Sequence, residues 1–377
     1  MAVACLSEAT ADFAVGLLQK LGGSGDKDVF FSPISITIAL GMTYAGAAGA
    51  TEEEFRTALF KNLAGAEVHG SLSEVLNSLN QKEAPFKLHT ANRLYSQDKF
   101  KAKQEFLNTL LKHYHSDFRQ VDFVSKTEEA RTEINGWVAE MTADKIKDLL
   151  SPGVLNTDTR LVIVNAIYFK AFWSIVFEES ATITKPFQVK QDVDINVDMM
   201  HNKDDFLYGE NEECQILAMY YTGAKLAMYI FLPKERFGLS AMLKGLSGSK
   251  MNQWIQNLSM NEVQVQLPKF KLDQTLDLKT QLQALGLAQM FDSKTADFRG
   301  ITEELQLFVT AVVHKAFIEV NESGTEAAAA TGVVVGLESC RMSFAPPKEF
   351  IADRPFLFSI IEHATDSILF IGTLASP

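Results

Sequence analysis

Residues 321–336 read NESGTEAAAATGVVVG, and this segment decides how the rest of the chain is interpreted. Four consecutive alanines favour a helix, whereas the glycines, the threonines and the Val-Val-Val run favour an extended chain. Counted by twos from Thr325, one face of an extended segment carries only small or β-branched side chains and no charge. The single charge, Glu326, falls on the other face. The segment therefore fits between two strands of a sheet, and the competing interpretation is a helical or flexible surface loop.

The flanking sequence favours the extended interpretation. Residues 310–320 alternate as a strand does, with Val312, His314 and Ile318 on one face. Beyond Gly336 the chain continues into the hydrophobic strands that finish it. A loop longer than about 15 residues is uncommon within a compact domain and is usually functional. The segment is therefore predicted to be a functional loop that can also become a strand.

Composition limits the classes of partner. The chain has 377 residues, of which 47% are hydrophobic and 22% charged, as in a soluble globular protein. The net charge of -12 argues against nucleic acid, because phosphate binding needs a basic face. No run of 18 apolar residues occurs, so no membrane span is predicted. The basic stretch KFKAK, Lys99 to Lys103, is interpreted as a solvated face, with a glycosaminoglycan contact as the less favoured alternative. The protein is expected to be a monomer.

Motifs of catalysis and metal binding are missing from the sequence. The three cysteines, Cys5, Cys214 and Cys340, are far apart and odd in number, so they predict neither a disulfide framework nor a metal site. The histidines of HYH at 113–115 would point apart on a helix. No cofactor, metal or enzymatic activity is therefore predicted. Two candidate N-glycosylation sites, at Asn257 and Asn321, are compatible with secretion.

Hydrophobic periodicity predicts an α+β protein with one domain over residues 1–377, helix-rich over 1–150 and sheet-rich over 160–377. The helix over 51–60 is expected to begin with Thr51 as its N-cap. The unbroken apolar run over 160–173 indicates a strand that is buried on both faces. The other helices are predicted at 7–21, 33–47, 71–81, 104–116, 127–144, 239–257 and 275–286. The other strands are predicted at 91–96, 192–200, 215–222, 225–233, 261–272, 310–320, 355–363 and 367–375.

Several segments resemble the serpin family, in the order in which serpins carry them. VNESGTEAAAATG at 320–332 resembles the hinge of a serpin reactive-centre loop, and FFSPISI at 30–36 resembles the start of the serpin shutter. LVIVNAIYFKAFW at 161–173 resembles the third strand of the large sheet, and residues 350–377 resemble the C-terminal signature. The resemblance covers about residues 13–376 and is nearest to secreted arthropod serpins, particularly those of ticks. It implies a serpin fold with a large, mixed, mostly antiparallel sheet A, two smaller sheets, about nine helices and an exposed reactive-centre loop over about 322–342.

The resemblance implies a suicide-substrate inhibitor of proteases. A target serine protease, or alternatively a cysteine protease, cuts the loop, which then inserts into the large sheet and traps the acylated enzyme. The family spacing of fourteen positions after Gly324 gives Glu338–Ser339 as the reactive bond, with cleavage after Leu337 or Arg341 as alternatives. Trypsin-like pockets take Arg or Lys and chymotrypsin-like pockets take apolar side chains, so weak inhibition of both is expected. The hinge residues are Gly324, Thr325, Glu326, Ala327, Ala328, Ala329, Ala330 and Thr331.

Two further clusters carry over from the family. Ser32, Ser35, Asn165 and His314 match the shutter, which controls how the sheet opens, although His314 is equally explained as a buried core histidine. Trp173, Lys269 and Glu322 match the breach, where insertion begins. The family also implies a secreted glycoprotein that modulates immunity or haemostasis, with a cytoplasmic protein as the alternative. The competing function is a non-inhibitory serpin that carries a small ligand or acts as a regulatory binding protein.

Overall fold

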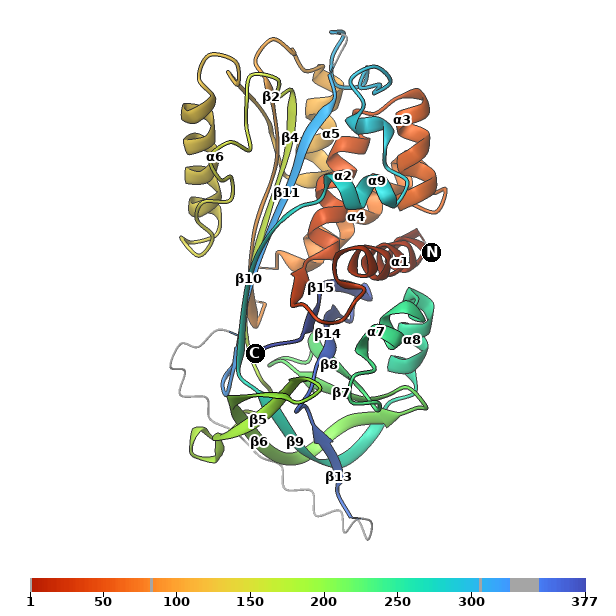
Figure 1. Ribbon diagram of the computed structural model, residues 1–377. Helices are drawn as coiled ribbons and strands as arrows, with labels where there is room; N and C mark the ends of the chain where they lie inside the picture. The colour runs from red at the N-terminus through yellow and green to blue at the C-terminus, as the bar shows by residue number, and fades with distance from the viewer. Residues whose placement is uncertain (1, 82–83, 305–306, 326–345) are drawn as a thin grey trace.

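Two β-sheets, of six and nine strands, form the framework of the computed structural model, which describes residues 2–81, 84–304, 307–325 and 346–377 (Figure 1). The predicted α+β architecture is confirmed, with nine α-helices in the described part of the chain. Six of these helices precede residue 142, and most strands follow residue 160. The two sheets meet where Figure 1 shows β8, β14 and β15 beside the lower part of the six-stranded sheet.

The six-stranded sheet has the order β10-β11-β12-β4-β2-β3. Its strands are β2 (Phe86–Gln97), β3 (Phe118–Val121), β4 (Leu161–Phe172), β10 (Phe270–Asp277), β11 (Val309–Asn321) and β12 (Gly324–Thr325). β4 and β11 pair directly and in parallel from Leu161 and Val309 to Tyr168 and Phe317. Beyond this stretch they diverge, and the two residues of β12 lie between them. This sheet is the predicted large sheet, and the divergence positions the candidate site.

The nine-stranded sheet combines the two predicted smaller sheets. Its 18-residue strand β6 (Val193–Glu210) pairs with β5 and β9 along most of its length and with β7 from Leu207 to Glu210. β6 therefore joins a β5-β6-β9-β13 part to a β1-β15-β14-β8-β7 part by hydrogen bonds. The other strands are β1 (Val29–Phe31), β5 (Ile183–Lys190), β7 (Cys214–Tyr220), β8 (Leu226–Pro233), β9 (Ser259–Pro268), β13 (Lys348–Ile351), β14 (Phe356–Glu362) and β15 (Ser367–Leu374).

Helices cover both faces of the six-stranded sheet. Figure 1 shows α6 (Thr127–Met141) against one face and α2 (Pro33–Tyr44), α4 (Gly65–Leu79) and α5 (Gln104–Tyr114) on the side of the other. β4 follows this arrangement, because its alternate residues belong to two separate cores. Ile163 packs in the core on the α2 side, whereas Val164 packs with Ile134 and Val138 of α6. The remaining helices are α1 (Ala2–Gly22), α3 (Gly49–Glu54), α7 (Leu239–Lys244), α8 (Gly248–Gln256) and α9 (Lys279–Ala284).

Helix α1 is long and apolar enough to cross a membrane by length and composition alone. The sequence, scanned for uninterrupted apolar runs, did not predict this. In the fold, Leu17 and Leu18 of α1 are fully buried, and Gln19 donates a 2.7 Å hydrogen bond to the carbonyl oxygen of Leu243. Within this structure α1 therefore packs as a core helix.

Three local predictions are wrong. Thr51 is not an N-cap, because α3 begins at Gly49 and the Thr51 hydroxyl instead accepts a 2.9 Å hydrogen bond from the Asp297 N–H. The strand expected over 261–272 is two strands in different sheets, β9 and β10, which are separated at Lys269. The helix expected over 239–257 is likewise two helices, α7 and α8, because the chain leaves helical geometry after Lys244.

Candidate functional site

The candidate site begins where β4 and β11 diverge. Gly324 pairs with Asn321 of β11 on one side and with Phe172 of β4 on the other, and Thr325 pairs with Val320 and Ala171. β12 is antiparallel to both neighbours. Of the segment predicted as an exposed loop, residues 322 and 324–325 are buried here and Ser323 is partly buried. The start of the predicted hinge is therefore already seated in the sheet.

Gly324 occupies a position that a larger residue cannot share. Its φ of +149° is one that side-chain-bearing residues rarely adopt, and a Cβ atom built on it would lie 2.2 Å from the Ala171 carbonyl oxygen. The same Cβ would lie 2.7 Å from the Phe172 Cα atom. Both contacts are to backbone, which cannot rotate away. The seated hinge therefore requires glycine here.

Thr325 is fully buried and points toward the interior. Its hydroxyl lies 2.8 Å from the hydroxyl of Tyr221, within hydrogen-bond distance. Tyr221 stacks on Trp173 with ring centroids 4.4 Å apart and 18° between the ring planes. Burial raises the pKa of Tyr221 far above its ordinary value, so this hydroxyl keeps its proton. Tyr221 was not predicted from the sequence, where it looks like any aromatic residue at the end of an apolar strand.

Glu322 and Lys269 form an ion pair of 3.1 Å beside the hinge. The Thr182 hydroxyl also donates to the Glu322 carboxylate, at 2.8 Å. Burial by itself would raise the pKa of Glu322, but hydrogen bonds from its own backbone, Thr182 and Lys269, with the Lys269 charge, hold that pKa below its ordinary value. The Glu322 side chain is only 9% exposed, whereas that of Lys269 is 38% exposed. The carboxylate is therefore fixed, and the lysine closes its open side.

Trp173 holds the turn between β11 and β12. Its indole Nε1–H donates to the Asn321 carbonyl oxygen at 3.0 Å, and its backbone N–H donates to the Ser323 carbonyl oxygen at 2.9 Å. The backbone N–H of Phe177 donates to the Glu322 carbonyl oxygen at 3.0 Å. The three residues predicted for the breach, Trp173, Lys269 and Glu322, therefore surround one turn.

The predicted shutter residues form a second cluster on the α2 side of the sheet. The Ser32 N–H donates to His314 Nε2 at 3.1 Å, and the Ser32 hydroxyl caps α2 by accepting from the Ser35 N–H. Because His314 Nε2 accepts, its Nδ1 carries the proton and donates to Asn165 Oδ1. Burial lowers the pKa of His314 to about 3, which keeps the imidazole neutral. The His314–Asn165 hydrogen bond joins β11 to β4.

Asn165 extends this cluster to a residue that the sequence analysis missed. Its Nδ2 donates to the Ser35 carbonyl oxygen at 3.0 Å and to the Ser35 hydroxyl at 2.6 Å. It also donates to Asn92 Oδ1, and Asn92 is the residue on β2 that pairs with Asn165 in the sheet. In the sequence, Asn92 could have been noticed as a polar residue within the predicted strand 91–96. The cluster therefore ties α2 to three neighbouring strands through Asn92, Asn165 and His314.

The two clusters lie apart on the same pair of strands. Asn165 and Ala171 are six residues apart on β4, which corresponds to about 20 Å in a strand. The remaining hinge residues and the reactive-bond candidates, Glu326 to Thr331, Leu337, Glu338, Ser339 and Arg341, lie outside the described residues. No group of three or more His, Cys, Asp or Glu that could hold a metal occurs in residues 2–81, 84–304, 307–325 and 346–377.

The two candidate glycosylation sites differ in exposure. Asn257 is exposed at the end of α8. Asn321 is only 7% exposed, and its side-chain oxygen accepts a hydrogen bond from the Ser323 N–H at 3.0 Å. A glycan on Asn321 has no room in this fold, whereas one on Asn257 would extend into solvent.

Comparison with known proteins agrees with this geometry. Residues 8–377 match the family described as serpin (serine protease inhibitor). The chain belongs to the serpin family. This serpin is 39% identical to the leukocyte elastase inhibitor of Xenopus tropicalis over 380 residues, 99% of each chain. It is also 39% identical to Iris of the tick Ixodes ricinus, over 98% of this chain and 99% of that one. The solved structure of human thyroxine-binding globulin complexed with thyroxine is 29% identical over 100% of both chains, with a TM-score of 0.91.

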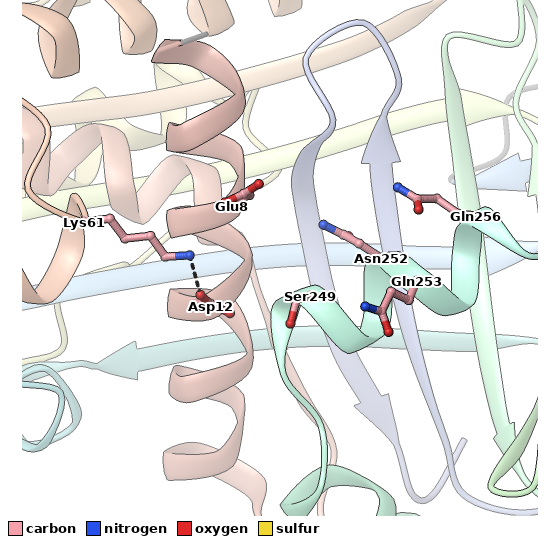
Figure 2. Close-up of a pocket in the computed structure, with 7 residues that line it drawn as sticks. All are labelled: Glu8, Asp12, Lys61, Ser249, Asn252, Gln253 and Gln256. Carbon is pink, nitrogen blue, oxygen red and sulfur yellow. Dashed lines mark ion pairs between the residues drawn. The ribbon is translucent and has the colours of Figure 1, made fainter.

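A surface pocket of about 260 Å³ lies between α1 and α8 (Figure 2). An ion pair of 2.6 Å joins Lys61 to Asp12 of α1 in this pocket. The lining side chains are all polar: Glu8, Asp12, Lys61, Ser249, Asn252, Gln253 and Gln256. Sites for drug-sized ligands are usually lined mainly by apolar and aromatic side chains. This pocket therefore does not suit an apolar ligand.

Proposed function

We propose that this serpin is a suicide-substrate inhibitor of serine proteases. A protease cuts the loop that follows Thr325, and the freed loop then inserts as a strand between β4 and β11 while the enzyme is still acylated. The observation that carries the proposal is β12, because its two residues already lie between these strands and are antiparallel to both. The similarity to proteins named as protease inhibitors supports the same conclusion.

The register of β12 predicts where each inserted residue would lie. Along β4, Thr325 pairs with Ala171, so the sixth residue further, Thr331, would face Asn165. Along β11, Thr325 pairs with Val320, so Thr331 would face His314 by the same count. Six positions preserve the face of a strand, so Thr331 would point toward the interior as Thr325 does. Its hydroxyl would then lie between Asn165 and His314.

Insertion needs the direct pairing of β4 and β11 to open. That pairing runs from Leu161 and Val309 to Tyr168 and Phe317, and the His314–Asn165 hydrogen bond crosses it. A strand inserted between β4 and β11 would roughly double their separation of about 4.8 Å and break this bond. We infer that the shutter residues hold the sheet closed before cleavage, and that Thr331 replaces their lost contact afterwards.

The identity of the reactive residue sets the target. With Glu338 before the cut, a protease with a basic specificity pocket is the best partner, because common digestive pockets exclude a carboxylate. Cleavage after Leu337 would suit an elastase-like enzyme, and the similarity to a leukocyte elastase inhibitor makes that class the first to test. Cleavage after Arg341 would lengthen the inserted segment and favour simple hydrolysis. We retain secretion as the proposed location, with the cytoplasm as the alternative.

The competing function is a non-inhibitory serpin that carries a small ligand. The similarity to thyroxine-binding globulin supports keeping it, since a shared fold does not separate carriers from inhibitors. Against it stands the seated hinge, because β12 already lies between β4 and β11. We therefore favour inhibition.

A protease panel tests the proposal. Each protease is incubated with the serpin, and the products are separated on a denaturing gel. Inhibition gives a band at the summed mass of both proteins, whereas simple cleavage after residue 338 of 377 gives a fragment of about 37 kDa from the 41.8 kDa chain. The clipped protein is then melted. No covalent band with any protease, together with no rise in melting temperature after cleavage, would overturn the proposal in favour of a binding protein.

A further inference from the structure

We propose that Tyr221 is a positioning residue that latches Thr325 in the sheet before cleavage, so that insertion starts from a seated end. The inference deepens the proposed inhibitory function and rests on it for its consequence. The latch is the pair of hydroxyl groups of Tyr221 and Thr325, which lie 2.8 Å apart. Tyr221 lies just beyond β7, and Thr325 is the last described residue before the loop.

The Tyr221 ring is held rigidly from several sides. Trp173 stacks on one face of the ring, with ring centroids 4.4 Å apart, and Phe169 packs edge to face against it, with centroids 5.4 Å apart. The backbone of Tyr221 is also fixed, because its N–H donates to the Leu226 carbonyl oxygen at 3.0 Å and the residue bridges to Trp173. Since Tyr221 is 1% exposed, its hydroxyl has a defined position and no access to bulk water.

The hydroxyl pair is closed to other partners within residues 2–81, 84–304, 307–325 and 346–377. There the Tyr221 hydroxyl forms a hydrogen bond only with Thr325, and the Thr325 hydroxyl only with Tyr221. Both residues are buried, so removal of one hydroxyl would leave the other without a partner. A buried polar group left unsatisfied is more unfavourable than the simultaneous loss of both groups. The pair therefore favours the seated hinge in a way that an exposed contact would not.

The shortness of β12 makes one side-chain hydrogen bond important. β12 contains only Gly324 and Thr325, and Gly324 contributes no side chain. The Glu322–Lys269 ion pair holds the preceding turn, but among the described residues neither side chain forms a hydrogen bond with β12, and the lysine is 38% exposed. Thr325 is therefore the single side chain of β12 that can attach this strand to the rest of the fold.

The latch has a consequence for trapping. After cleavage the loop must insert before water releases the acylated protease. A hinge that is already seated begins insertion with its first two residues in register, whereas an unlatched hinge must first find the slot. Weakening the latch should therefore divert molecules from trapping to simple cleavage, without changing which bond is cut.

Hydrogen exchange on the intact, full-length protein tests the latch directly. Y221F, T325V and the double variant Y221F/T325V are compared with the wild type, and Y220F serves as the control at the neighbouring tyrosine. We expect peptides that cover residues 321–325 to exchange about five- to tenfold faster in each single variant, the change that one hydrogen bond produces. The double variant should lose no more protection than either single variant, because both hydroxyls are then gone. A merely structural role for Tyr221 would instead speed exchange across β7 and β8 as well.

The same variants are then tested with a protease that the wild type traps. Y221F and T325V should give about five- to tenfold more clipped product per covalent complex than the wild type or Y220F. Unchanged exchange over residues 321–325 in Y221F, or additive effects in the double variant, would overturn the latch even if trapping is normal. Coupled exchange effects without trapping of any protease would instead support the latch and contradict the inhibitory function.

Discussion

Replacing Thr325 by arginine should turn an inhibitor into a substrate. The Thr325 side chain is fully buried between Ala171 and Val320, and its hydroxyl meets that of Tyr221. An arginine at this position would have to enter a site walled by aliphatic and aromatic groups. Before cleavage the arginine can avoid this site by leaving the sheet, because β12 is only two residues long. After cleavage, insertion in the register of β12 would force it inward.

The size of the effect follows from these contacts. Burying a charge without a partner costs several kcal/mol, and the lost hydroxyl pair adds about 1 kcal/mol. A total of about 4 kcal/mol corresponds to roughly a 1000-fold slower insertion, at about 1.4 kcal/mol for each factor of ten. Hydrolysis of the acyl-enzyme is not slowed, so it should win almost completely. The intact variant should melt within a few degrees of the wild type, because its hinge can unseat.

Each variant is incubated with a protease that the wild type traps, and a denaturing gel measures the ratio of covalent complex to clipped fragment. Thr325→Arg should give only the clipped fragment, whereas Thr325→Ser keeps a small side chain with a hydroxyl and should still form the covalent complex. Glu326→Arg is the matched charge control, because alternation assigns Glu326 to the opposite face. If Thr325→Arg formed as much covalent complex as Thr325→Ser, the assigned face and the insertion mechanism would both be wrong.

Three other changes test the same geometry. Gly324→Ala places a Cβ atom 2.2 Å from the Ala171 oxygen, so hydrogen exchange over residues 321–325 should approach that of an unstructured segment; retained protection would contradict the register. Burial lowers the His314 pKa to about 3, whereas the pKa of an unfolded histidine is about 6.5. The contribution of neutral His314 to the free energy of unfolding is therefore complete above pH 6.5 and is lost as the pH falls toward 3, by about 2 kcal/mol at pH 5. Urea unfolding of His314→Asn should show a smaller loss of stability in acid than the wild type. The remaining loss includes His69, whose pKa burial and His113 lower to about 4, and carboxylates with lowered pKa values such as that of Glu322; an equal loss in both proteins would contradict the role of His314. Thr331→Val should leave the melting of the intact protein unchanged and reduce the rise in melting temperature after cleavage, and an undiminished rise would argue against its meeting Asn165 and His314.

Much of the fold could be predicted where one local pattern matches one tertiary environment. β4 is an example, because residues 161–169, which are apolar except for Asn165, are buried on both faces by two helix layers. Prediction failed where the same pattern serves two elements. Residues 261–272 were predicted as one strand, although their apolar residues change from odd positions up to Leu267 to even positions from Phe270. Lys269 lies at this change and passes the chain from one sheet to the other, and alternation carries no information about which sheet receives a strand. The short strand β13 was missed for the related reason that half of its residues are exposed.

The residues of the candidate site likewise include some that could be predicted from the sequence and some that could not. Ser32, Ser35, Asn165 and His314 were chosen through family resemblance, and they form one hydrogen-bonded cluster. Asn92 was missed because its role depends on register with Asn165, which is set by strand pairing and not by neighbouring residues.

Tyr221 could not have been singled out from the sequence. Its hydroxyl gains meaning only because Thr325, 104 residues away in the chain, is folded beside it. Contacts of such long sequence separation are the part of the site that requires a structure.

The direct pairing of β4 with β11 has a thermodynamic consequence. These two strands run parallel at the centre of a sheet whose other central pairs are antiparallel. Parallel pairing is slightly less stable per residue than antiparallel pairing. An inserted strand that continues β12 would replace one parallel ladder with two antiparallel ladders, which would add hydrogen bonds and also improve their geometry. In the proposed mechanism, the sheet of the intact protein is thus one strand short of its most favourable arrangement, and the cleaved loop of the same chain would supply that strand.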